Sequence, residues 1–332
     1  MPEFRKDPVT GRWIIISSER AARSQGQVIV TEPVETDPCP FCAGNEALTP
    51  PEVLAYRGNK TQVDMPGWTV RVVPNKYPAL VNDGSWTGHT EGIYESIDGL
   101  GVHEVIIESP EHIVNMAALN VKQTSDVLRA YRQRMLELRN DKRWRYILLY
   151  KNQGAQAGAT LEHIHSQLIA LPAVPKEALE EIAGASAYFD SARRCIYCAI
   201  IQQETDQRKR IVIEHERFVA LCPFAPRFPY ETWILPREHA SRFEEISKND
   251  VVELSRALRD MLIRLNRRLE NPPFNYIIHS NPLDAVANGY YHWHIEILPK
   301  LMQAAGFEWG SGAAINPVAP EDAAQLLRAA LA

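Results

Sequence analysis

The chain of 332 residues is long enough for two domains, each with its own core. Its hydrophobic content of 45% and charged content of 23% are typical of globular proteins and exclude disorder over most of the length. The net charge of -5 gives no basic surface for nucleic acid or anionic lipid, the start has no apolar signal, and no apolar run could span a membrane. We therefore expect a cytoplasmic protein with no nucleic-acid partner and no membrane association.

The first half of the chain is predicted to contain several strands and one principal helix. The helix is indicated by Leu128, Tyr131, Met135 and Leu138, which recur on one helical face. In chain order, the expected elements are a strand at 5–17, a polar loop at 17–23, strands at 53–56 and 68–73, a turn at 75–80, an insertion loop at 82–101, a strand at 103–108, the helix at 124–138, and strands at 145–150 and 161–171.

The second half repeats this order after a connector. Residues 176–190 are predicted to form a linking helix or an irregular connector, and the charged stretch at 202–210 is expected to be a solvated surface. A long helix near 250–269 carries leucines on its apolar side. The strands expected in this half are at 211–213, 218–221, 230–235 and 275–279.

The stretch at 152–167 carries the clearest chemical pattern. It reads Asn-Gln-Gly-Ala-Gln-Ala-Gly-Ala-Thr-Leu-Glu-His-Ile-His-Ser-Gln, a loop of small residues that leads into a strand. Because side chains alternate along a strand, His163, His165 and Gln167 are expected on one face. The glycines of the loop would allow its backbone to approach a phosphate closely.

Two spacings recur in both halves and predict an internal duplication. A glutamate precedes a histidine by eight residues, and an asparagine precedes a histidine by eleven. The pairs are Glu104 and His112, Glu231 and His239, Asn152 and His163, and Asn281 and His292. Each half also carries a Cys-x-x-Cys near its beginning and a His-x-His near its end. We predict an N-terminal domain at 1–175 and a C-terminal domain at 176–332, each of the α+β class with an antiparallel sheet and helices packed on it.

Cysteines and histidines form two sets with the composition of a zinc site. Paired Cys-x-x-Cys motifs in a reducing compartment more often bind metal than form disulfides. A histidine beside a helix is often only a surface residue, but equivalent placement in both halves favours metal binding. Tetrahedral zinc commonly takes two thiolates and two imidazoles. The predicted ligand sets are Cys39, Cys42, His112 and His163 in the first half, and Cys195, Cys198, His239 and His292 in the second.

This assignment leaves His165 and His294 without a metal. A histidine two residues from a metal ligand is held rigidly, and imidazole acts as a nucleophile near neutral pH without a separate base. We interpret His294 as a half-buried structural histidine. We interpret His165, which follows the glycine loop and precedes Gln167, as the nucleophile.

These motifs together resemble the galactose-1-phosphate uridylyltransferases of the histidine-triad superfamily. The resemblance covers nearly the whole chain, and the His-x-His-x-Gln pattern with its upstream loop is its specific part. The residues that carry it are His163-Ile164-His165-Ser166-Gln167, Asn152, Arg20-Ala21-Ala22-Arg23, the first Cys-x-x-Cys, His112 and Gly306-Phe307-Glu308-Trp309-Gly310.

The resemblance implies a role for each matching residue. His165 would take a nucleotidyl group from a nucleotide sugar, and Gln167 would bind the transferred phosphoryl group. A segment of the partner subunit in a homodimer would reach the hexose. The substrate-binding residues implied are Asn152 and Thr160 at phosphate oxygens, Arg20 and Arg23 nearby, Asn75 at the nucleobase, and Phe307 and Glu308 at the hexose.

Three departures from the bacterial family pattern leave the nucleobase and the second metal open. Asn75 is followed by Lys76, where those members have an acidic residue that favours uridine. Those members hold iron in the second half, whereas this chain has a Cys-x-x-Cys zinc pattern there. The segments Gly310-Ser311-Gly312 and Ile315-Asn316-Pro317 look more like a branch that includes a plant ADP-glucose phosphorylase.

The residue at position 167 separates transferases from hydrolases of this superfamily. Histidine-triad hydrolases have a third histidine there, which can protonate a poor leaving group. Glutamine has no proton to give, but a sugar phosphate leaves without one because its second pKa is about 6. Gln167 therefore permits exchange between phosphates.

The sequence predicts a UDP-glucose:hexose-1-phosphate uridylyltransferase of galactose metabolism, built from two histidine-triad-like repeats with two zinc ions. UDP-glucose would leave a uridylyl group on His165, and galactose 1-phosphate would take it to give UDP-galactose. The expected partners are these nucleotide sugars and hexose 1-phosphates. Two alternatives stay open: an ADP-sugar phosphorylase that transfers an adenylyl group to inorganic phosphate, and a zinc-stabilised nucleotide-binding module without catalysis.

Overall fold

The computed structural model describes residues 2–19, 37–58, 61–84, 87–285 and 289–331. Arg20 and Arg23, which the resemblance places near phosphate, lie outside the described residues. Over the described part of the chain, no helix has the length and apolar character needed to cross a membrane.

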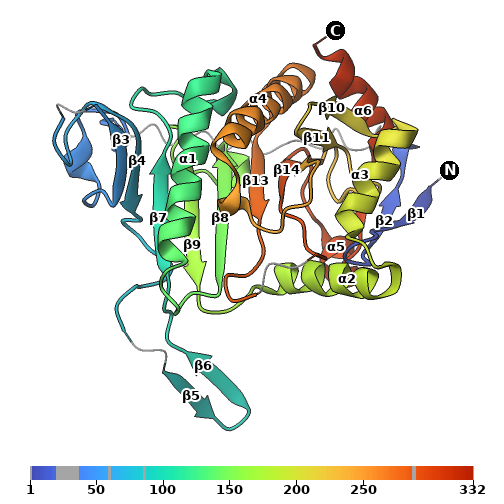
Figure 1. Ribbon diagram of the computed structural model, residues 1–332, viewed down its shortest axis with the longest axis horizontal. Helices are drawn as coiled ribbons and strands as arrows, with labels where there is room; N and C mark the ends of the chain where they lie inside the picture. Colours follow the sequence, from blue (N-terminus) through green and yellow to red (C-terminus); the bar gives the residue numbers. More distant parts are fainter. Residues whose placement is uncertain (1, 20–36, 59–60, 85–86, 286–288, 332) are drawn as a thin grey trace.

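Ten strands from both halves form one antiparallel sheet (Figure 1). The two halves meet where β8 pairs with β13, so Tyr150 lies opposite Ile277. The predicted α+β class is confirmed, with the two expected sheets joined edge to edge; the domain division at residue 175 stays a prediction. In spatial order the strands are β10 (Ile211–Glu214), β11 (Phe218–Leu221), β12 (Thr232–Pro236), β14 (His294–Pro299), β13 (Phe274–His279), β8 (Tyr146–Gln153), β9 (His165–Leu171), β7 (Val102–Ile107), β4 (Trp68–Pro74) and β3 (Leu54–Arg57).

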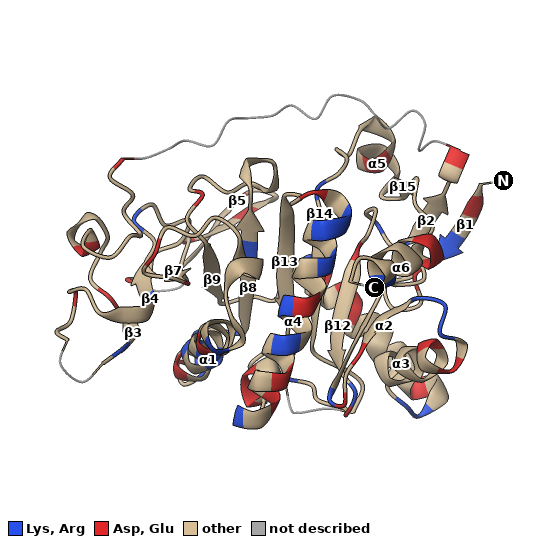
Figure 2. Cartoon of the chain, turned by 90° about the horizontal axis from the view of Figure 1, so that it is seen from above, with Lys and Arg blue, Asp and Glu red and all other residues tan. Residues whose placement is uncertain are grey.

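Two long helices, α1 (Val121–Leu138) and α4 (Lys248–Leu269), pack against each other on one face of this sheet (Figure 2). Each begins at a capping side chain: Asn120 accepts from the backbone N–H of Gln123, and Ser247 accepts from that of Asp250. Arg134 of α1 faces the sheet, where it donates to Glu104 of β7 at 2.6 Å. The apolar stripes predicted from the sequence are buried in the main core, which includes Leu128, Tyr131, Met135, Leu254, Leu258, Leu262 and Leu265.

The opposite face of the sheet is covered in the second half by α2 (Lys176–Ala192) and α3 (Ile196–Gln207). Ile196, Tyr197, Trp233 and Leu235 form a separate core beneath these helices. The remaining elements are a small sheet of β1 (Glu3–Lys6), β2 (Trp13–Ile16) and β15 (Ala314–Asn316), the hairpin of β5 (Gly88–Glu91) and β6 (Tyr94–Ile97), the helices α5 (Gly306–Ser311) and α6 (Pro320–Ala329), and short 3-10 turns at Glu46–Leu48, Met116–Ala118, Ala155–Ala157 and Phe243–Glu245.

Several local predictions differ from the structure. The connector at 176–190 is helix α2, and the loop at 82–101 contains the β5–β6 hairpin, which projects from the body of the molecule (Figure 1). The stretch at 202–210 is not simply a solvated face, because it includes the end of α3, where Glu204 is buried and accepts from Arg210 at 2.6 Å. Strand β9 begins at His165 rather than at 161, so His163 lies in the turn before it.

The strand register also corrects the equivalences taken from sequence spacing. Gln167 lies opposite Tyr150, and Glu296 lies opposite Ile277. Tyr150 and Ile277 are therefore equivalent, and so are the residues two positions further on, Asn152 and His279. The counterpart of Asn152 is His279 and not Asn281. Sequence spacing indicated Asn281 because the connection between the two strands is longer in the second half: fifteen residues from His279 to His294, against thirteen from Asn152 to His165.

The same reasoning applies to the glutamates. Val105 lies opposite Gln167 and Trp233 lies opposite Glu296. The counterpart of Glu231 is therefore His103 and not Glu104. The duplication stands, but its repeated positions carry different chemistry in the two halves.

Candidate functional site

Strand β9 presents His165 and Gln167 on one face of the sheet and Ser166 on the other, as alternation requires. On the helix side, the Ser166 hydroxyl lies 2.6 Å from the Tyr131 hydroxyl of α1. On the other side, Phe41 of the Cys-x-x-Cys loop meets the His165 ring edge-on, with centroids 5.2 Å apart. The two residues of interest thus share the face that α1 and α4 do not cover.

The His165 ring is fixed in one tautomer. Its Nδ1 lies 2.8 Å from the backbone carbonyl oxygen of His163, which can only accept, so Nδ1 carries the proton. The lone pair is then on Nε2. Burial lowers the pKa of His165, and the charge of Lys151 lowers it further. Both effects keep the imidazole neutral, which is the form that attacks phosphorus.

A buried polar network lies beneath the same strand. Lys151 donates to the Glu108 carboxylate at 2.5 Å and to the backbone carbonyl of His165 at 3.0 Å, and both charged side chains are fully buried. The other oxygen of Glu108 accepts from Tyr131 and Ser166. Burial lowers the pKa of Lys151, while Glu108 opposes this effect. The pair therefore ties β8 and β7 to the backbone of the candidate nucleophile.

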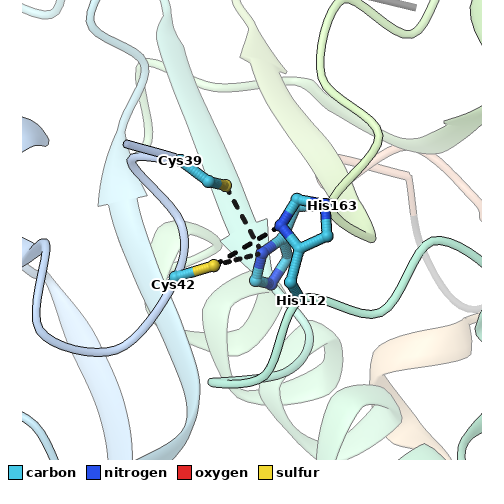
Figure 3. Close-up of side chains that lie close together, drawn as sticks. All are labelled: Cys39, Cys42, His112 and His163. Atoms are coloured by element: carbon cyan, nitrogen blue, oxygen red, sulfur yellow. Dashed lines mark hydrogen bonds between the residues drawn. The ribbon is translucent and has the colours of Figure 1, made fainter. Parts of the chain in front are cut away.

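The two sets of cysteines and histidines predicted from the sequence each come together in space. In the first, Sγ of Cys42 lies 3.4 Å from Nδ1 of His112 and 3.6 Å from Nδ1 of His163, and Sγ of Cys39 lies 3.6 Å from the latter (Figure 3). All four ligand atoms lie within 4.8 Å of one another, and Cys195, Cys198, His239 and His292 form a second such group. Each group could hold a metal ion.

Hydrogen bonds on the far side of each ring suit metal binding. Nε2 of His163 lies 2.8 Å from the carbonyl oxygen of Ser109, and Nε2 of His292 lies 3.0 Å from that of Pro236. Each Nε2 must therefore donate, which leaves the lone pair of Nδ1 directed at the sulfur atoms. Burial also lowers the pKa of His163 to about 4, so the ring stays neutral.

In the second half, the positions that correspond to His165 and Gln167 are His294 and Glu296, and charged side chains lie around them. Nδ1 of His279 lies 3.1 Å from Glu181, and Arg227 donates to Glu296 at 2.6 Å. Burial opposes protonation of His279, but Glu181 raises its pKa to about 10. Burial lowers the pKa of the stacked His294 to about 4. Glu181, His279 and His294 also bring their ligand atoms within 4.8 Å.

The cavity beside His294 and Glu296 measures about 30 Å³. This volume has room for one or two water molecules and none for a nucleotide. A cavity of about 480 Å³ lies at the glycine loop of the first half, lined by residues that include Gly154, Leu161 and Asn271. Neither His165 nor Gln167 lines it.

The predicted substrate-binding residues fall into two places. Asn75 and Asn152 lie near β9: Nδ2 of Asn75 is 3.5 Å from Oε1 of Gln167, and Asn152 accepts from Asn275 of β13 at 2.7 Å. Thr160 is exposed in the loop that leads to β9. Phe307 and Glu308 lie on α5, beside β15 and away from β9 in both views (Figures 1 and 2). Within one chain they do not reach His165.

Sequence reasoning missed several residues of the site. Four of them belong to no motif, and the sequence pattern there predicts only strands: His103, Glu108, Tyr150 and Lys151. One signal was available: Lys151 continues the run Tyr-Ile-Leu-Leu-Tyr, and a charge at the end of a buried strand needs a partner. The partner could not be named without the strand order.

Comparison with known proteins identifies the family. The sequence pattern of the galactose-1-phosphate uridyl transferase N-terminal domain matches residues 1–175, and that of the C-terminal domain matches residues 181–328. The chain belongs to the galactose-1-phosphate uridylyltransferase family. Members of this family transfer nucleotidyl groups between sugar phosphates, so the protein is an enzyme of the nucleotidyltransferase class.

Within this family, the chain is more similar to a phosphorylase than to the uridylyltransferases. It is 37% identical to the ADP-glucose phosphorylase of Arabidopsis thaliana over 98% of this chain and 92% of that protein. The crystal structure of the Arabidopsis enzyme with bound ADP-glucose superposes with a TM-score of 0.84 at 36% identity, over 99% of both chains. The galactose-1-phosphate uridylyltransferase of Thermotoga maritima is 29% identical over 99% of this chain and 98% of that protein.

This comparison corrects the function predicted from the sequence. The prediction of a UDP-glucose:hexose-1-phosphate uridylyltransferase is wrong, and the alternative of an ADP-sugar phosphorylase has the better support. The motifs around His165 are shared by both kinds of enzyme, so they could not separate them. The departures at Lys76 and at Gly310-Ser311-Gly312 already favoured this alternative.

The Lys151–Glu108 pair generates a stability prediction. Replacing Lys151→Met leaves the Glu108 carboxylate buried without its counter-charge and should lower the free energy of unfolding by about 3–5 kcal/mol. Urea denaturation of the purified chain measures this change. The matched double variant Lys151→Met/Glu108→Gln should recover a large part of the loss, because no charge is then buried. A single variant within about 1 kcal/mol of the parent would show that the pair is not needed by the fold.

Proposed function

We propose that the chain is an ADP-glucose phosphorylase, which transfers the adenylyl group of ADP-glucose to inorganic phosphate through His165. The observation that carries this proposal is the 37% identity with the Arabidopsis ADP-glucose phosphorylase over almost the whole chain. Lys76 supports adenine over uridine, because it replaces the acidic residue that would favour uridine.

The reaction is proposed to proceed in two displacements at the α-phosphorus. Nε2 of His165 attacks, the bond to the bridging oxygen breaks, and glucose 1-phosphate leaves with the electron pair. An oxygen of inorganic phosphate then attacks adenylyl-His165, the P–N bond breaks, and ADP leaves. Both the leaving group and the acceptor are phosphate anions, so Gln167 need only donate hydrogen bonds to the transferred group. Asn152 and Thr160 are proposed to contact its oxygens as well.

We further propose that both Cys-Cys-His-His groups hold zinc. A tetrahedral zinc with Zn–S bonds of about 2.3 Å and Zn–N bonds of about 2.1 Å separates sulfur from nitrogen ligands by about 3.6 Å. The sulfur–nitrogen distances in the two groups are 3.4 to 3.6 Å. Such thiolate sites suit a reducing compartment, which agrees with a cytoplasmic enzyme.

A homodimer is proposed to complete the site. Phe307 and Glu308 lie on α5 away from β9 of their own chain, and Phe307 is 45% exposed. A partner subunit could therefore supply both, with the carboxylate accepting hydrogen bonds from glucose hydroxyls. Arg20 and Arg23 are proposed to bind phosphate oxygens.

The first prediction of this proposal concerns the covalent intermediate. Incubation of the purified enzyme with ADP-glucose, without phosphate, should add one adenylyl group that intact mass spectrometry detects. The adduct should survive base and be lost in acid, as expected for a phosphoramidate. Inorganic phosphate should release ADP from it.

Two variants locate the adduct on the proposed residue. His165→Ala should acquire no label, whereas His294→Ala, altered at the equivalent position of the other half, should be labelled almost normally. Labelling by UDP-glucose in preference to ADP-glucose would contradict the assigned nucleobase. Normal labelling of His165→Ala would remove it as the nucleophile.

The second prediction concerns the metal. Elemental analysis should give two zinc ions per chain, and Cys195→Ser should lower this toward one and reduce the melting temperature. Activity measured well below the melting range should fall much less than in His163→Ala, because only His163 adjoins the nucleophile. Equal loss of activity in the two variants would make the second zinc catalytic, contrary to the proposal.

The third prediction concerns the shared site. His165→Ala and Glu308→Ala homodimers should each be weakly active. After mixing and subunit exchange, half of the dimers contain one chain of each kind, and each of these has one intact site. About a quarter of the parental activity should therefore return, since a two-fold dimer has two equivalent sites. No recovery, in a mixture shown by native mass spectrometry to have exchanged subunits, would place Glu308 outside the partner's site.

A further inference from the structure

The side-chain oxygen of Gln167 lies where three donors converge. Oε1 is 2.7 Å from Nε2 of His103, 3.1 Å from the hydroxyl of Tyr150 and 3.5 Å from Nδ2 of Asn75. These residues come from β7, β8 and the turn after β4, so the strand order alone brings them around Gln167.

Backbone groups decide which atoms donate. The N–H of Ala79 donates to Nδ1 of His103 at 3.1 Å, so the proton of this imidazole is on Nε2, facing Gln167. The N–H of Tyr77 donates to Oδ1 of Asn75 at 2.9 Å, which turns the NH₂ group of Asn75 toward the same place. Nε2 of His103 and Nδ2 of Asn75 are 3.2 Å apart and both carry protons, so both must seek an acceptor. The acceptor is the oxygen of Gln167.

We infer that His103 and Asn75 are positioning residues that fix the orientation of the Gln167 amide. With its oxygen held by these donors, the NH₂ group of Gln167 is the part left to face the phosphoryl group on His165. A reversed amide would place its N–H groups against the N–H groups of His103 and Asn75, which can only donate, and would present an oxygen to a phosphate oxygen. This inference rests on the proposed function, because it assumes that a nucleotidyl group is transferred through His165.

The second half shows what the same positions look like without this arrangement. The counterparts of His103 and Gln167 are Glu231 and Glu296. Burial and then the charge of Glu296 raise the pKa of Glu231 to about 8. Arg227 links the two: its guanidinium donates to Glu296 at 2.6 Å and its backbone N–H donates to Glu231 at 2.7 Å. Neither glutamate carries an NH₂ group, so the second half has no amide to orient at these positions. Of the two equivalent places, the one in the first half presents an oriented NH₂ group.

An oriented NH₂ group would act most strongly on the transition state. Negative charge on the non-bridging oxygens is then held by a donor whose direction is already set, which costs no reorganisation during the reaction. The turn at 75–79 would thus influence catalysis through the hydrogen bonds that two of its backbone N–H groups donate to Asn75 and His103.

A double-mutant cycle on the full-length enzyme tests this inference. His103→Phe keeps a planar ring but removes the donor, and should slow single-turnover adenylylation by ADP-glucose about 10- to 100-fold. In a Gln167→Ala background the same change should have an effect of less than about 2-fold, since there is no amide left to orient. His103→Gln, which retains a donor, should recover part of the rate.

A second readout separates orientation from general damage. The two diastereomers of ADP-glucose with sulfur on the α-phosphorus should react at different rates in the parent enzyme, because an oriented NH₂ group favours one non-bridging oxygen. This preference should fall toward the value for Gln167→Ala in His103→Phe. It should fall as well in Ala79→Pro, which removes only the backbone donor that sets the His103 tautomer.

The outcomes distinguish this inference from the proposed function. If His103→Phe, with an unchanged melting temperature, slows the reaction equally with and without Gln167, or leaves the diastereomer preference intact, the inference is wrong. If His103→Phe does not fold, the diastereomer preference of Ala79→Pro tests the inference instead. A preference equal to that of the parent enzyme would then contradict it. Absence of any adenylyl adduct in the parent enzyme would instead contradict the proposed function.

Discussion

The register of β9 between β7 and β8 is the constraint on which the site depends. It places His165 and Gln167 on the face that α1 and α4 do not cover, and Ser166 in the buried network with Glu108 and Tyr131. A slip by one residue would exchange these faces, turning the nucleophile toward the helices and Ser166 away from them. The Lys151 ammonium donates to the carbonyl of His165 and opposes such a slip, because the slip would remove this hydrogen bond from a buried charge.

The duplication explains how one half can specialise. Both halves contribute strands to one sheet and both carry a Cys-Cys-His-His group, so both have the same framework. In the second half, ion pairs of Arg227, Glu296 and His279 lie on the face that corresponds to that of His165 and Gln167, beside a cavity of only about 30 Å³. In the first half, neutral groups surround Gln167 and leave an amide free to face an anion. Charge, rather than fold, separates the two sites.

Much of this was predictable from the sequence, and the failures have physical causes. Alternation placed His165 and Gln167 on one face, and equivalent motifs predicted both cysteine–histidine groups. Counting residues failed for Asn281, because a connection of different length shifts the match while the strand register stays fixed. The donors around Gln167 could not be found, since His103 and Tyr150 become neighbours only through the order of strands. The nucleobase could not be identified from the motifs that handle phosphate, because these are the same for UDP and ADP sugars.

One site in the first half is proposed to carry the adenylyl group between two phosphates. Isotope exchange tests it most directly. With inorganic phosphate removed, the enzyme should transfer label from free glucose 1-phosphate into ADP-glucose, because the first displacement is reversible and needs no second substrate. Complete dependence of this exchange on added phosphate, in an enzyme that is active in the full reaction, would mean direct transfer without an intermediate and would contradict the account.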